Sequence, residues 1–303
     1  MRYRVLIFLC VVLQATAISA QSKLDSFLTP SDTLHIPRRK AVVVTQASLG
    51  AVTLIGLNTL WYSEHKQSKF HTIDDSSEWF QLDKMGHAYS GYQLGRLGAA
   101  SLKWSGADKK QQLLYGGTLG FSFLTAVELM DGFSQEWGFS WSDFTANTVG
   151  AGLYIGQELL WDEQRIALKY SFHQTEYANL NPNKLGRGLT EEFLKDYNGQ
   201  TYWLSVNLHS FFKDSTLPKW LNVAFGYGAQ GMLSGTHTVQ LEHGFHQNRY
   251  AEYYFSLDLD LTKIESKSAF IRTLLSAFNS IKIPFPTLEM SSEKGVKLHA
   301  FYF

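Results

Sequence analysis

The chain contains one cysteine, Cys10, among 303 residues, and Cys10 lies in an apolar stretch near the N-terminus. The remainder of the chain therefore cannot form a disulfide and provides no thiolate nucleophile or thiolate metal ligand. The 27 basic residues equal the 27 acidic ones in number, so there is no basic surplus for binding nucleic acid. Only 18% of residues are charged and 45% are hydrophobic, which excludes a disordered chain.

Several catalytic sequence motifs are also missing. The sequence has no G-x-x-x-x-G-K-S/T phosphate loop, no H-E-x-x-H zinc motif, no G-x-S-x-G nucleophile turn and no G-x-G-x-x-G after a strand. These absences remove the common P-loop, zinc-protease, serine-hydrolase and dinucleotide-binding assignments. Any chemistry must come from a less familiar arrangement of side chains.

The first twenty residues are typical of an export signal. A basic "MRYR" precedes the apolar "VLIFLCVVLQATA", and "ISA" before Gln21 predicts cleavage after Ala20. We therefore predict a signal peptide at 1–20 and a polar linker at 21–40. The bulky Leu9 in front of Cys10 argues against lipid attachment at that cysteine.

Four apolar stretches follow, at 41–60, 84–103, 112–131 and 142–161, each about the ~20 residues that a membrane helix needs. Tryptophans, including Trp61, Trp104 and Trp161, lie between them as in an interfacial belt. We predict an antiparallel four-helix bundle over 41–162, associated with a membrane or embedded in it. A soluble bundle with buried helices is the alternative.

The distribution of charge bears on which membrane is involved. A cleaved signal places the cluster from Arg38 to Lys40 outside the cytoplasm, which contradicts the positive-inside rule for an inner-membrane protein. Association with the outer membrane or its periplasmic face removes this contradiction.

From about residue 163 the apolar period changes from helical spacing to alternation. In "YYFSLDLDL" the residues Phe255, Leu257 and Leu259 fall on one face and polar residues on the other. We predict an antiparallel β region at 163–303 with five to seven strands and one inserted helix near 267–280. The predicted fold class is α+β.

Three pairs of polar residues interrupt the helices at matching ends. Asp83 and His87 are spaced i, i+4, as are Asp143 and Asn147, while Glu128 and Asp131 are spaced i, i+3. In an antiparallel bundle these pairs converge. Negative charge in the last turn of a helix opposes its dipole, so the acidic pair needs a counter-charge. Lys84, a protonated histidine or a metal ion can supply it.

The converging groups admit structural and chemical interpretations. A helix cap explains Asp83, and Ser140 with Asp143 resembles a capping box. One histidine with several carboxylates also suits acid–base catalysis or a divalent metal. The candidate catalytic residues are Asp83, Lys84, His87, Glu128 and Asp143. The candidate metal ligands are His87, Glu128, Asp131, Asp143 and Asn147.

The segments "DKMGH", "ELMDGFSQEWGFSWSD" and "IPFPTLE" resemble the YfiM-like family of periplasmic lipoproteins of unknown function. The helical part is more distantly similar to VanZ-like membrane proteins, through D-K-x-x-H, an acid, and D-x-x-x-N-x-x-G. The resemblance implies an exported envelope protein whose polar site includes Asp83, Lys84, His87, Glu128, Asp143 and Asn147. It implies no established reaction.

Together these features predict an exported cell-envelope protein with a structural or binding role and membrane lipid as a partner. The alternative is a hydrolase, metal-dependent or acid–base, that acts on a lipid or cell-wall precursor. Whether the chain is an enzyme stays open at this point.

Overall fold

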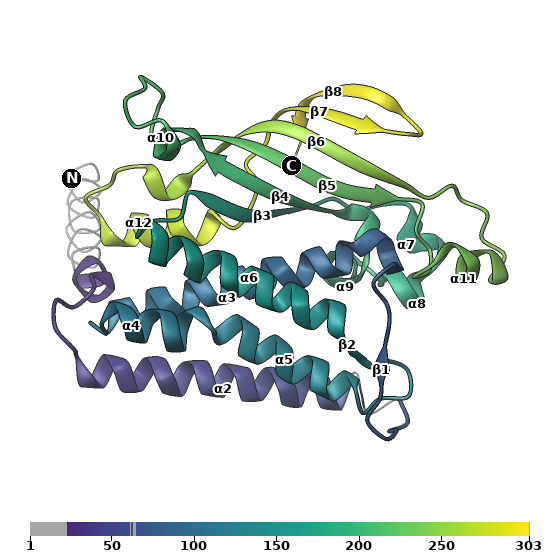
Figure 1. Cartoon of the computed structure of the whole chain (residues 1–303), viewed down its shortest axis with the longest axis horizontal. Helices are drawn as coiled ribbons and strands as arrows, with labels where there is room; N and C mark the ends of the chain where they lie inside the picture. The colour runs from purple at the N-terminus through teal and green to yellow at the C-terminus, as the bar shows by residue number, and fades with distance from the viewer. Residues whose placement is uncertain (1–22, 61, 63–64, 303) are drawn as a thin grey trace, which may run out of the picture.

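The computed structural model describes residues 23–60, 62 and 65–302. The predicted signal peptide with Cys10, and Trp61, lie outside the described residues. The fold is α+β, with a layer of helices on one side and a six-stranded antiparallel sheet on the other (Figure 1). The predicted fold class and the predicted antiparallel β region are confirmed.

The long helices run along the molecule in alternating directions (Figure 1). They are α2 (Ile36–Leu60), α3 (Leu82–Trp104), α5 (Leu119–Asp131) and α6 (Trp141–Leu160). The short helix α4 (Lys109–Gln111) and the π-helical turn η3 (Gln112–Gly117) lead into α5. The end of α5 and the starts of α3 and α6 therefore meet at one end of the helical layer.

Glycines bring the backbones of α3, α5 and α6 close together. A Cβ atom on Gly98 would lie 2.4 Å from the carbonyl oxygen of Gly116, and one on Gly150 would lie 2.0 Å from that of Ala88. Such short contacts leave no room for a side chain at either position. Helix α3 is therefore the central helix, packed against both η3–α5 and α6.

Helix α2 lies beside this group but buries few of its side chains. Val42 packs with Leu102, and the Gln46 amide donates to Ser101 Oγ at 2.7 Å. Large side chains elsewhere on α2, such as Val44, Val52 and Ile55, are more than 60% exposed. The four-helix bundle predicted from the sequence thus stays a prediction. Helix α2 begins at Ile36, within the predicted linker, and residues 23–28 are also helical.

Two helical segments, Ile36–Thr59 and Lys109–Asp131, are long and apolar enough to cross a membrane, among the residues that the structure describes. The expectation of four such segments is corrected accordingly. Helix α3 contains Asp83, Lys84 and Arg96, and α6 contains Asp143 and Glu158. These charged residues lower the hydropathy of α3 and α6.

The sheet is an antiparallel meander in the order β3-β4-β5-β6-β7-β8. Short helices and turns connect the strands, and α12 (Ala269–Phe278) lies within the segment predicted to be helical. The strands are β3 (Ile166–Phe172), β4 (Gln200–Asn207), β5 (Leu221–Gln230), β6 (Tyr250–Leu259), β7 (Phe285–Ser291) and β8 (Gly295–Tyr302). The connecting elements are α7 (Tyr177–Leu180), α8 (Pro182–Leu185), α9 (Leu189–Lys195), η4 (Tyr197–Gly199), α10 (Leu208–Phe211), α11 (His237–Glu242) and η5 (Leu261–Lys263).

The two faces of the sheet differ sharply in polarity. One row of paired residues crosses all six strands on what we call the apolar face: Leu168, Leu204, Phe225, Phe255, Leu288 and Leu298. On the opposite, polar face, Lys169 of β3 forms an ion pair with Asp258 of β6 at 2.7 Å, and neither side chain is exposed. Because β4 and β5 separate these strands, the sheet must curl around its polar face.

The apolar face meets the helical layer at the β3–β4 side. Leu168 packs against the cluster of Tyr92 and Tyr154, and the rings of Tyr89 and Tyr170 lie 5.7 Å apart. This junction between α3 and the sheet positions the candidate site, because α3 starts beside strand residues from the C-terminal half.

We predict that Gly150→Ala destabilises the protein by roughly 2 kcal/mol or more, because the added Cβ would overlap the Ala88 carbonyl. A methyl group added to Gly152 on the same helix would have nothing within 4 Å, so Gly152→Ala is expected to stabilise by about 0.5–1 kcal/mol through helix propensity. Thermal unfolding of both variants checks this pair. Equal effects would contradict the close α3–α6 contact.

Candidate functional site

The segment before α3 has an unusual backbone. Trp79, Phe80 and Gln81 all have positive φ, at 48°, 52° and 64°. Such angles cost side-chain-bearing residues roughly 1–2 kcal/mol each. Contacts from the sheet side hold the segment, because the Trp79 amide donates to Gly235 O at 2.8 Å and Tyr227 Oη donates to Phe80 O at 2.9 Å. The first turn of α3 is thus fixed by residues far along the chain.

Lys84 links three segments through its ammonium group. Nζ lies 2.5 Å from Asp75 Oδ2, 3.0 Å from Asp83 Oδ2 and 2.9 Å from Asp143 Oδ1. Lys84 is only 9% exposed. A buried ammonium with three carboxylates around it is stable because the partners replace its lost hydration. The lysine therefore connects α3 to α6 and to the loop that contains Asp75.

Asp75 was not among the residues that the sequence predicts, and it has a central place in this network. Ser140 Oγ donates to Asp75 Oδ1 at 2.6 Å and Ser142 Oγ does so at 2.8 Å. Burial alone would raise the pKa of Asp75, but Lys84 and the two serines outweigh it and lower that pKa to about 2. Ser140 also caps α6, since its Oγ accepts from the Asp143 amide as the capping-box interpretation expects.

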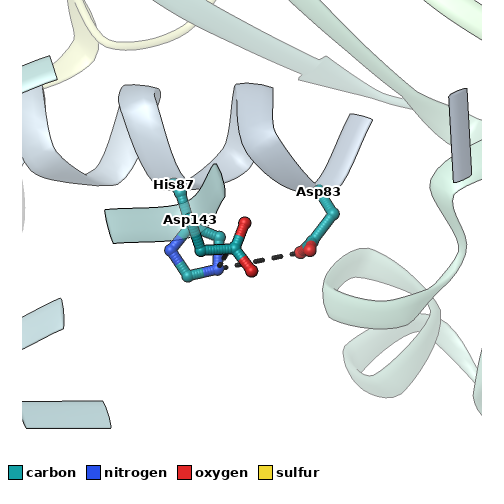
Figure 2. A group of neighbouring side chains, drawn as sticks. All are labelled: Asp83, His87 and Asp143. Atoms are coloured by element: carbon teal, nitrogen blue, oxygen red, sulfur yellow. Dashed lines mark ion pairs between the residues drawn. The ribbon is translucent and has the colours of Figure 1, made fainter. Parts of the chain in front are cut away.

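His87 stands in the middle of three carboxylates. Its Nε2 lies 3.8 Å from Asp83 Oδ1, 3.8 Å from Glu128 Oε1 and 3.9 Å from Asp143 Oδ1. Figure 2 shows Asp83 and His87 of α3 and Asp143 of α6 pointing toward one another. On the other side of the ring, Nδ1 lies 3.0 Å from Asn147 Oδ1. Because an amide oxygen only accepts, Nδ1 holds the hydrogen and Nε2 faces the acids.

The acids shift the protonation of the histidine, and burial shifts that of the acids. Burial would lower the pKa of His87, but Asp83, Asp143 and Glu128 raise it above its ordinary value. Burial, followed by the charge of Asp83, raises the pKa of Asp143 to about 6. Burial would lower the pKa of Lys84, but the charges of Asp83 and Asp143 outweigh burial and raise it. The site therefore favours cations among its carboxylates.

Glu128 and Asp131, the acidic pair at the end of α5, have different surroundings. Glu128 is buried beside His87, and its Oε2 accepts from the Ser140 amide at 3.3 Å. Asp131 accepts from Tyr62 Oη at 2.6 Å. The structure therefore places Glu128 with the histidine and Asp131 against Tyr62. The predicted metal ligands include Asp131, but in the structure it is Asp83 that lies beside His87.

A cavity of about 340 Å³ opens onto this cluster between the helical layer and the sheet. Asp83 and His87 form its polar end, and Tyr197 Oη donates to Asp83 Oδ1 at 2.8 Å. The rest of the lining is aromatic or apolar for the most part: Gly86, Tyr89, Ser90, Leu124, Tyr170, Phe193, Leu194, Tyr197, Gln200 and Tyr202. Such a volume with a few polar groups at one end is typical of a small-molecule site.

The residues that the sequence missed come from irregular or β segments. Asp75 lies in a loop, Tyr197 in a short turn, and Tyr170 and Tyr202 on neighbouring strands. None of these residues shares a helix face with another predicted site residue. The high aromatic content of 15% is a sequence signal for the tyrosines but not for Asp75.

Residues 70–156 match the model of a family described as a predicted periplasmic lipoprotein (DUF2279). The matched segment includes Asp75, Lys84, His87, Glu128 and Asp143, and it ends before the sheet. This similarity supports an exported, cell-envelope location and a family of unknown function. It gives no support to the YfiM or VanZ names. No curated protein and no solved structure matches the chain at a significant level.

We predict that Lys84→Met lowers the free energy of unfolding by about 3–5 kcal/mol, because it leaves Asp75 and Asp143 buried without their counter-charge. Lys184, which pairs with Glu136 at the surface, is the matched control, and Lys184→Met is expected to change stability little. Chemical denaturation of the two variants measures the difference. Similar values would contradict a network centred on Lys84.

Proposed function

We propose that the chain is an exported, membrane-associated protein of the cell envelope that binds a small amphipathic molecule in the cavity beside Asp83 and His87. One observation carries this proposal: the cavity joins a buried charged cluster to an apolar lining. A protein in which the polar groups only stabilise the fold needs no such opening.

The lining of the cavity defines the chemistry of the ligand. Asp83 accepts hydrogen bonds or pairs with a cation, and His87 can donate or accept depending on its protonation. Leu124, Phe193 and Leu194 offer apolar contacts to the remainder of the molecule. A lipid-derived molecule with a polar head group fits this division.

Membrane association is supported by α2. A core helix of a soluble protein would pass the same test of length and hydropathy, but only 6% of the apolar window of α2 is buried. Exposed apolar residues also occur on the other long helices, with Leu114 and Leu129 on η3–α5 and Val149 and Leu159 on α6. Lipid would cover the apolar side chains that the helices of the predicted four-helix bundle leave exposed. The predicted export of the N-terminus favours the outer membrane or its periplasmic face.

The hydrolase alternative receives less support from the geometry. Ser140 and Ser142, two hydroxyl groups at the start of α6 beside Asp143, both donate to Asp75. Lys84 already forms ion pairs with Asp83 and Asp143. The carboxylates of the cluster are therefore arranged around the ammonium group of Lys84. This arrangement suits binding and stability better than activation of a nucleophile.

A cavity-filling substitution tests the proposed binding role. Ser90→Leu is expected to exclude the ligand from the cavity, whereas Ser122→Leu on the exposed surface of α5 leaves the cavity unchanged. The full chain and both variants are purified from carbonate-washed membranes, and mass spectrometry of an organic extract identifies what co-purifies. We expect one amphipathic species with the wild type and Ser122→Leu, and its loss with Ser90→Leu.

Two results would contradict the proposal. Release of the chain into the carbonate wash would exclude membrane association, and equal amounts of every co-purified species in the two variants would exclude the cavity as the binding site.

A divalent cation is a second candidate ligand, favoured by the position of His87. Its Nε2 faces three carboxylate oxygens at nearly equal distances, all too long for a hydrogen bond. Asp83, His87 and Asp143 present one ligand atom each within 4.8 Å of one another, and Glu128 lies beside them. Nitrogen and oxygen ligands in this combination suit Mn²⁺, Fe²⁺ or Zn²⁺. Asn147 would orient the ring from behind through Nδ1.

Elemental analysis tests the cation. If a cation is a ligand, the purified chain dialysed against Mn²⁺ or Zn²⁺ retains about one equivalent, His87→Ala abolishes retention, and His243→Ala at an exposed histidine does not. Retention unaffected by His87→Ala, or no metal in any sample together with a loss of thermal stability in His87→Ala, would assign a structural role to the histidine.

A further inference from the structure

From β5 to β8 the sheet is inverted relative to that of a soluble protein. An antiparallel sheet with one wet face normally turns its apolar side chains to the core. Here the side chains on the polar face are the buried ones: Asn222, Ser256, Asp258, Thr287 and Glu289 are at most 3% exposed. On the apolar face, Phe225, Phe255 and Leu298 are 51%, 42% and 74% exposed.

The exposed part of the apolar face is uniform in character. On β5 and β6 the positions of the apolar face alternate with the polar ones, and every one is an apolar residue or a tyrosine: Leu221, Val223, Phe225, Tyr227, Ala229, Ala251, Tyr253, Phe255, Leu257 and Leu259. Of these, Phe225, Tyr253, Phe255 and Leu257 are exposed, whereas Ala229 is buried against the start of α3. Cross-strand rings extend the surface, since Phe225 and Phe255 lie 5.4 Å apart. A continuous patch of this kind marks a contact with an apolar partner.

The length of the strands that carry the patch bears on the nature of that partner. Strands β5 and β6 have ten residues each, which corresponds to roughly 33 Å and to the length of a membrane strand.

The geometry points to bilayer hydrocarbon as the occupant of the apolar face of β5–β8. In sheets that span a membrane, apolar side chains face outward to the lipid and polar side chains face inward. The inference goes beyond ligand binding in the cavity and rests only on the membrane association proposed above. It adds a second lipid-facing surface, formed by the sheet.

Spin labels on the sheet test this assignment. In a Cys10→Ser background, single cysteines replace Tyr253, Phe255 or Leu257 on the apolar face, and His243 in an exposed turn serves as the aqueous control. The labelled full chain is reconstituted into vesicles of phosphatidylethanolamine and phosphatidylglycerol. We expect the three sheet labels to be relaxed by oxygen and protected from a water-soluble nickel chelate, and the label at position 243 to show the opposite.

Two outcomes would overturn the inference. Sheet labels accessible to nickel, in protein that resists carbonate extraction, would place this face in water while leaving the membrane association of α2 intact. Labels protected from both reagents, with dipolar broadening between molecules, would assign the face to a second copy of the chain. Circular dichroism checks folding, and Val296→Cys and Leu298→Cys at the exposed edge report the same surface if a central variant does not fold.

Discussion

The arrangement of the site depends on one buried ammonium group. Lys84 is the point at which the loop with Asp75, the first turn of α3 and the start of α6 are held together. Its charge allows acids to remain inside an apolar helical layer, and those acids in turn raise the pKa of His87. The serines at the start of α6 then orient Asp75, so the helix cap and the charged cluster are one network.

Close backbone packing places this network next to the sheet. Glycines let α3 approach α5 and α6 so closely that α3 becomes the central helix, and its outer side then meets the tyrosines of β3 and β4. The cavity is the space left where this helix, the turn with Tyr197 and the strands do not fill the junction completely. Helical layer and sheet therefore both contribute to a site whose charged residues all come from the helical half.

Much of this could be predicted from spacing alone. Asp83 with His87, and Asp143 with Asn147, share helix faces, and antiparallel connectivity brings those faces to the same end. The role of Asp75 could not be predicted, because a loop residue has no period and its partner is nine positions away on the far side of a turn. Alternation revealed the strands, but it could not show that their polar side would be the buried one. That choice depends on the curl of the sheet, which lets Lys169 reach Asp258.

The left-handed turn at Trp79, Phe80 and Gln81 has a consequence for the order of assembly. During synthesis and export the helices emerge before the strands, yet the contacts that hold this strained turn come from Tyr227 and Gly235. Until those residues arrive, the backbone in front of α3 has no reason to keep three unfavourable conformations. Helices α3, α5 and α6 can pair early through their glycines, but the carboxylate of Asp83 reaches its final position only when the C-terminal half has folded against them. The final geometry of the charged cluster therefore depends on residues that lie far beyond it in the sequence.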